Sequence, residues 1–276
     1  KGANRPTCHH CGMQLREMVR KLPKVSELPD KYRGLSDKAK ATVVLGASLA
    51  LALTIALALT ELFSEILESV DEGEGIAVWD RPVLDWVLGI RSEGLNNAVA
   101  WYSNTGGPMW QPIVTGIVVI VLSWRWRDIT PLVLTIIAVG GSLLITVVGK
   151  GVVGRARPPL EEAIPPHESS MSFPSGHSLN ALVIAGILAY LLIRHFWDRG
   201  QVVKWLIGVL AALYAISMGL SRVYLGHHWL TDVFGAWAIG LAWLAVVIAC
   251  HRVWRAVRSR TEKGPVDEEG ARAPRP

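Results

Sequence analysis

Charged side chains are scarce in this sequence: they make up 18% of the 276 residues, whereas 51% are hydrophobic. So little charge leaves too little polar surface for an ordinary soluble domain. Charge is absent altogether from five long runs, residues 41–60, 94–124, 129–149, 205–221 and 233–250. Each run is close to the roughly 20 residues that a helix needs to cross a bilayer. A shorter uncharged run, 178–193, reaches span length when it is extended backwards to residue 169. We therefore predict an all-α bundle of six transmembrane helices.

Cysteine is also rare, and three residues, one of them in the last predicted span, exclude a disulfide framework. Cys8 and Cys11 have the spacing of half a zinc ribbon, in which two thiolates face one metal. No second pair follows in the sequence. Two interpretations stay open for this segment: a reduced, unstructured stretch of chain, or a zinc site shared between protomers. The sequence does not specify an oligomeric state.

Composition divides the chain into three parts. Residues 1–37 are polar and are predicted to form a cytoplasmic extension, residues 38–258 hold the six spans, and residues 259–276 are predicted to be a disordered cytoplasmic tail. Between the first two spans, apolar and charged positions alternate over residues 76–99. This pattern favours short amphipathic helices in the membrane interface, with a plain extracellular loop as the alternative.

The net charge of +5 does not indicate a nucleic-acid partner, because the basic residues flank spans instead of forming one soluble face. If the amino terminus is cytoplasmic, the cytoplasmic segments carry 22 of the 28 Lys and Arg. The positive-inside rule then predicts a plasma-membrane or inner-membrane protein with both termini in the cytoplasm. The six remaining cations, on the predicted outer side, are Arg81, Arg91, Lys150, Arg155, Arg157 and Arg222.

Three short groups of polar residues lie at the predicted outer ends of the spans. They are Lys150 with Arg157-Pro158, then Pro174-Ser175-Gly176-His177, then Ser221-Arg222 with His228 and Asp232. Each group has an ordinary explanation by itself: a lysine reaches toward headgroups, Pro-Ser-Gly starts a helix with the serine as cap, and His-x3-Asp is often structural. Three independent groups at one membrane face argue against the ordinary explanations.

Together these residues have the chemistry to hold and break a phosphate ester. The arginine fork matches pairs of phosphate oxygens and lysine adds a point charge, so Lys150, Arg157 and Arg222 are predicted to bind the phosphoryl group. A helix amino terminus also attracts anions, and Gly176 lets the backbone approach closely. His228 and Asp232 lie four apart, on one face of a helix, so they can hydrogen-bond. His227 is a rival that the spacing to Asp232 disfavours.

At these spacings the chain resembles the type 2 phosphatidic acid phosphatase (PAP2) superfamily in all three motifs. The resemblance implies an integral-membrane lipid phosphate phosphatase that works through a phosphohistidine, without metal or other cofactor. It assigns His228 as nucleophile, His177 as general acid and base, and Asp232 as the group that orients His228. The residues that it assigns to the phosphate are Lys150, Arg157, Ser175, Gly176 and Arg222.

Other functions share these residues. Vanadate-dependent haloperoxidases have a similar pocket but are soluble. A phosphotransferase differs only in what attacks the phosphohistidine, and a transporter or channel also has ionisable groups in the membrane. Among substrates, an outward-facing site favours a polyprenyl diphosphate, with phosphatidate or phosphatidylglycerophosphate as the alternative. The loop of residues 155–173 is either a lid over the site or a solvated connector.

Overall fold

The computed structural model describes residues 36–261, and all of their regular structure is helical. The described residues from Ser48 onward belong to one compact unit. The predicted extension of residues 1–37, which includes Cys8 and Cys11, lies almost entirely outside the described residues, as does most of the predicted tail from residue 259. The zinc interpretation and the predicted disorder of the tail therefore stay untested predictions.

Among the described residues 36–261, five helices are long and apolar enough to cross a membrane. They are α3 (Asp37–Glu72), α7 (Thr130–Val153), α8 (Gly176–His195), α9 (Gln201–Tyr224) and α10 (Leu230–Thr261). Helices α5 (Glu93–Thr105) and α6 (Trp110–Trp126), bent by 49° relative to each other, pass the same test as a pair and make a sixth candidate span if they form one crossing. The predicted six-span bundle is confirmed with this difference. Gly106, Gly107 and Pro108 lie at the break, and a glycine pair followed by proline is a strong helix breaker.

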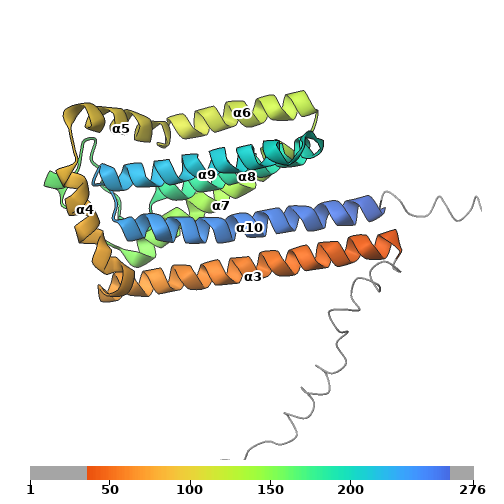
Figure 1. Ribbon diagram of the computed structural model, residues 1–276, viewed down its shortest axis with the longest axis horizontal. Helices are drawn as coiled ribbons and strands as arrows, with labels where there is room; N and C mark the ends of the chain where they lie inside the picture. The colour runs from red at the N-terminus through yellow and green to blue at the C-terminus, as the bar shows by residue number, and fades with distance from the viewer. Residues whose placement is uncertain (1–35, 262–276) are drawn as a thin grey trace, which may run out of the picture. The chain divides into compact units, whose positions relative to one another are not determined.

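Short helices do lie between the first two spans, as predicted. A 3-10 turn, η2 (Gly75–Trp79), leads into α4 (Asp80–Gly89), and both precede the bent pair α5 and α6. Figure 1 shows α4 lying across the end of the long helices. The buried residues of α4 include Leu84 and Val87, and Val87 packs with Val223 and Tyr224 at the end of α9. The segment is therefore part of the folded core and not a free loop.

Helix α8 is central, because it packs against α7, α9 and α10. Its core residues Leu179, Val183 and Ile187 are fully buried and recur every fourth position, so they form one face of the helix. Glycine permits a close approach between α7 and α10: a methyl group at Gly141 would overlap the indole of Trp243. The Trp243 Nε1 donates to the Ala138 carbonyl at 2.9 Å.

The predicted backward extension of the run 178–193 to residue 169 is wrong. Helix α8 begins at Gly176 with Ser175 as its N-cap and continues forward to His195. A residue that precedes proline disfavours helical geometry, so the chain before Pro174 leaves the helix. The segment between α7 and α8 is a loop that includes the short turn η3 (Leu160–Glu162). A second short turn, η4 (Trp197–Arg199), joins α8 to α9.

Candidate active site

The three polar groups meet at one end of the helix bundle. Consecutive long helices run in opposite directions, so the ends of α7 and α9 and the beginnings of α8 and α10 lie together. These ends and the loops beside them carry Lys150, Arg157, Ser175, Gly176, His177, Arg222, His228 and Asp232. Helix polarity therefore brings together residues that are far apart in the chain.

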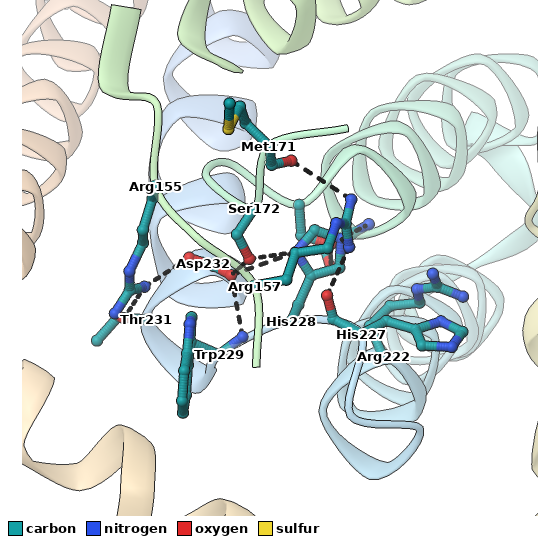
Figure 2. A network of polar contacts seen from close by, with 12 residues as sticks. Arg155, Arg157, Met171, Ser172, Arg222, His227, His228, Trp229, Thr231 and Asp232 are labelled. Atoms are coloured by element: carbon teal, nitrogen blue, oxygen red, sulfur yellow. Dashed lines mark hydrogen bonds and ion pairs between the residues drawn. The ribbon is translucent and has the colours of Figure 1, made fainter. Parts of the chain in front are cut away.

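His228 and Asp232 form the buried pair that the spacing predicts. The Nδ1 of His228 lies 3.2 Å from Oδ2 of Asp232, and the two side chains are 1% and 0% exposed (Figure 2). Since a carboxylate accepts hydrogen bonds, Nδ1 carries the proton and Nε2 keeps its lone pair. That nitrogen lies 3.2 Å from Nη1 of Arg157. Burial, together with Arg157 and Arg222, holds the pKa of His228 well below its usual value of 6.5.

Asp232 is held by groups that sequence reasoning missed. Ser172 donates to its Oδ2 through a short hydrogen bond, and Arg155 donates to its Oδ1 at 2.5 Å. Arg155 also pairs with Asp80 of α4 at 2.6 Å. Asp80 in turn accepts from the amide and hydroxyl of Thr231, at 2.9 and 2.6 Å. In the sequence, Arg155 stood out only as one of the few cations on the predicted outer side. Asp80 lies in the segment of alternating apolar and charged residues, where nothing distinguished it from its neighbours.

The phosphate-binding cations predicted from the sequence contact the loop that follows Arg157. Lys150 Nζ donates to Ser170 Oγ at 3.1 Å and, through a short hydrogen bond, to the Met171 carbonyl. Arg157 Nε donates to the Ser170 carbonyl at 2.6 Å, and its Nη1 donates to the His227 carbonyl at 2.5 Å. Residues 168–171 thus lie directly on these cations. Because residues 168–171 contact these cations, they are not part of a solvated connector.

Glu168, which the sequence did not single out, binds two of the three cations. Its Oε2 lies 2.7 Å from Nη2 of Arg157, and its Oε1 forms a short ion pair with Nη2 of Arg222. The same Oε1 lies 3.8 Å from Nδ1 of His177. Burial alone would raise the pKa of Glu168, but Arg222 and the neighbouring cations outweigh it and lower the pKa to about 2. The carboxylate is therefore ionised at neutral pH.

The beginning of α8 has the geometry of a capped helix. Ser175 is fully buried, and its Oγ accepts from the Ser178 amide at 3.5 Å and from the Ser178 hydroxyl at 2.8 Å. Gly176 and His177 instead line the neighbouring cavity. The structure thus places Gly176 and His177 beside the cations, while the Ser175 side chain serves the cap.

His227 differs from His228 in its contacts. Its Nε2 is 2.6 Å from the Ile164 carbonyl, to which it donates, and its buried Nδ1 has no partner among residues 36–261. Burial and the charge of Arg222 lower the pKa of His227 to about 4. Within residues 36–261, Asp232 contacts the ring of His228 and forms no hydrogen bond with the ring of His227. The contact with Asp232 that the spacing predicts is therefore made by His228.

A cavity of about 1000 Å³ opens beside this cluster and continues along the helices. Its polar end holds Lys150, Glu168, His177 and Arg222. Its remaining wall comes largely from apolar residues of α6, α7 and α8, among them Val119, Leu132, Ile136, Val139, Leu143 and Ile184. Within residues 36–261, no three His, Cys, Asp or Glu side chains are grouped so as to hold a metal ion.

Fold and site together define an integral membrane protein with a cluster of cations and a buried His-Asp pair at the ends of its spans. Three comparisons identify the class more closely. The family model described as the PAP2 superfamily matches residues 129–256. Phosphatidylglycerophosphatase B of Bacillus subtilis is 30% identical over 182 residues, which are 65% of this chain and 87% of that protein. An undecaprenyl-diphosphatase of Sulfolobus acidocaldarius is 30% identical over 156 residues, 55% of this chain and 68% of that protein.

A solved structure agrees with the sequence matches. It is the crystal structure of a transmembrane PAP2-type phosphatidylglycerolphosphate phosphatase from Bacillus subtilis, with a TM-score of 0.63 and 27% identity. The match covers 77% of this chain and 98% of that chain. The chain belongs to the PAP2 superfamily. It is a membrane hydrolase of phosphate esters, and its class is that of the lipid phosphate phosphatases.

Proposed function

We propose that the protein hydrolyses a polyprenyl diphosphate to the monophosphate through a phosphohistidine on His228. One observation carries the chemistry: Asp232 holds Nδ1 of His228, so the lone pair of Nε2 faces Arg157 and the neighbouring cations. A neutral imidazole in this tautomer is a competent nucleophile. The low pKa of His228 keeps the ring neutral at physiological pH.

The reaction has two displacements at one phosphorus. In the first, Nε2 of His228 forms a bond to the terminal phosphorus, the bond to the bridging oxygen breaks, and His177 gives that oxygen a proton. In the second, His177 takes a proton from water, the water oxygen attacks phosphorus, and the P–N bond breaks to release inorganic phosphate. Lys150, Arg157, Arg222 and the amide of Gly176 stabilise the charge on the phosphoryl oxygens in both steps.

The shape of the cavity supports a lipid with a long chain. Its lining on α7 runs from Lys150 to Leu132, which spans about 27 Å at the rise of an α-helix. That length is close to the full thickness of the hydrocarbon core, roughly 30 Å, and exceeds a single leaflet. A polyprenyl chain suits such a groove, and the Sulfolobus relative is named as an undecaprenyl-diphosphatase.

Phosphatidylglycerophosphate is the second candidate substrate. It is favoured by the Bacillus relative of which this chain covers 87%, and that relative is named as a phosphatidylglycerophosphatase. Both candidates end in a terminal phosphate, so the cations would bind them alike. The choice between them rests on the lipid chains and on the group next to the terminal phosphate.

A panel of lipids with purified protein tests this function. We expect release of inorganic phosphate, fastest from the polyprenyl diphosphate, slower from phosphatidylglycerophosphate and phosphatidate, and undiminished in EDTA. Phosphate release that stops in EDTA would contradict the metal-independent mechanism. Transfer of the phosphate to an added sugar or lipid acceptor, without free phosphate, would show a phosphotransferase instead. Absence of any turnover would favour a transporter.

We further propose that the site faces the extracytoplasmic side and that both termini are cytoplasmic. The support is the charge distribution, since few Lys and Arg lie at the end of the spans that carries the site and most lie at the other end or in the terminal segments. Alkaline phosphatase fused to the carboxyl end should be inactive in whole cells, and a fluorescent protein fused there should fluoresce. The opposite pair of results would reverse the orientation.

A further inference from the structure

Glu168 lies where the proposed function needs a phosphate. Its two carboxylate oxygens bind Arg157 and Arg222, the two guanidinium groups assigned to the phosphoryl group. It also lines the same cavity as Lys150 and His177. A carboxylate and a phosphate cannot share these donors, so a lipid phosphate that enters the site has to displace Glu168.

The loop around Glu168 occupies further donors that the proposed function assigns to the phosphate. Lys150 donates hydrogen bonds to Ser170 and Met171, and Arg157 donates two more to Ser170. His228 beneath them is only 1% exposed, too little for a phosphorus atom to reach Nε2. Residues 168–171 must therefore leave the cations before the reaction can start.

The cluster also holds a donor that Glu168 does not use. Arg222 is 3% exposed, and its Nε has no hydrogen-bond partner among residues 36–261. A carboxylate has two oxygens, whereas a terminal phosphate has three. The unused donor indicates that the site is built for an anion with more acceptors than Glu168 supplies.

We propose that Glu168 is a specificity-determining residue. It occupies the phosphate site and thereby excludes phosphodiester lipids from it. Bilayer headgroups such as phosphatidylglycerol carry one negative charge on a diester phosphate and surround the site at high local concentration. Glu168 also carries one charge, and its attachment to the chain gives it a high effective concentration. A terminal phosphate carries about −1.5 to −2 at pH 7 and three acceptor oxygens, so it displaces Glu168 where a diester does not. This inference rests on the proposed function and adds selection by charge to it.

A competing role for Glu168 would be to position His177. Its Oε1 is 3.8 Å from Nδ1 of His177, beyond hydrogen-bond distance. The two roles also predict different kinetics. A positioning residue supports kcat, whereas a competitor for the phosphate site raises KM and leaves kcat intact.

The test compares Glu168→Gln with wild type and with Glu161→Gln. The amide keeps the shape of Glu168 and removes its charge, and Glu161 is an exposed carboxylate of the same loop that makes no contact with the three cations. Binding of inorganic phosphate is measured by calorimetry, without turnover. Hydrolysis of phosphatidylglycerophosphate in detergent micelles is then measured with increasing phosphatidylglycerol.

We expect phosphate to bind Glu168→Gln at least about tenfold more tightly than wild type, because a hydrogen-bonded charge pair contributes about that factor. KM should fall, kcat should not, and phosphatidylglycerol should inhibit the variant but neither wild type nor Glu161→Gln. A fall in kcat at constant KM would overturn the proposal in favour of a positioning role, and unchanged phosphate binding would overturn it outright. If wild type hydrolyses none of the lipids while phosphate binding still tightens in the variant, the proposed function fails and the role of Glu168 stands.

Discussion

Replacing His228 with alanine is expected to abolish hydrolysis of every phosphate ester, whereas replacing His177 with alanine should spare esters with good leaving groups. In the proposed mechanism, no phosphohistidine can form without Nε2 of His228, and loss of a nucleophile lowers kcat by about 10⁴-fold or more. His177 is proposed to protonate the leaving oxygen. Its loss should cost about 10²- to 10⁴-fold on an alkyl phosphate and much less on a nitrophenyl phosphate, whose leaving group needs no proton.

His227 provides the matched control for this experiment. It is the neighbour of His228, is 5% exposed, and donates from Nε2 to the Ile164 carbonyl. In His227→Gln the amide can keep that hydrogen bond, so most of the activity should remain on both substrates. An equal loss on both substrates in His177→Ala would contradict the acid role. A loss of activity in His227→Gln as large as that in His228→Ala would contradict the assignment of His228 as the nucleophile.

Replacing Arg155 with methionine is expected to destabilise the fold strongly. Arg155 lies between two buried carboxylates, 2.6 Å from Asp80 and 2.5 Å from Asp232, which are 5% and 0% exposed (Figure 2 shows Arg155 and Asp232). Methionine leaves both charges without their partner, and breaking a buried pair costs about 3–5 kcal/mol. Thermal unfolding in detergent, followed by loss of helical circular dichroism, should show a lower midpoint. Activity should fall as well, because Asp232 loses one of the groups that hold it beside His228.

Arg81 and Asp80 supply the controls. Arg81 pairs with Asp85 and Glu162 at the same end of the bundle, but its side chain is half exposed, so Arg81→Met should move the midpoint little. Adding Asp80→Asn to Arg155→Met removes one of the two orphaned charges and should recover part of the lost stability. If Arg155→Met unfolds at the same temperature as Arg81→Met, the buried network does not hold this end of the fold.

Much of the site was predictable because its motifs mark helix ends. Uncharged runs of span length predict the helices, and their alternating direction then places Lys150, His177, Arg222 and His228 at one end. The spacing of His228 and Asp232 also predicts their contact, since residues four apart share one helix face. The break between α5 and α6 falls at Gly106, Gly107 and Pro108, which are helix-breaking residues, but the spacing of residues does not give its angle of 49°.

Asp80, Arg155, Ser172 and Glu168 could not be assigned in this way. Asp80 lies 75 positions before Arg155, and the pair forms only because α4 packs against the end of the bundle. Ser172 and Glu168 belong to a loop without periodicity, so no pattern relates them to Asp232 or to the cations. Their partners are set by the path of the loop across the site.

The sequence alone determined the membrane class, the number of spans and the residues of the three motifs. The length of an apolar run and the spacing of residues along a helix are local properties of the chain, so they can be read without the tertiary structure. Only the tertiary structure decided that Arg155 joins Asp80 to Asp232 and that Glu168 occupies the cations. Those contacts join segments that no helical repeat connects, and they depend on how loops and short helices pack around the ends of the spans.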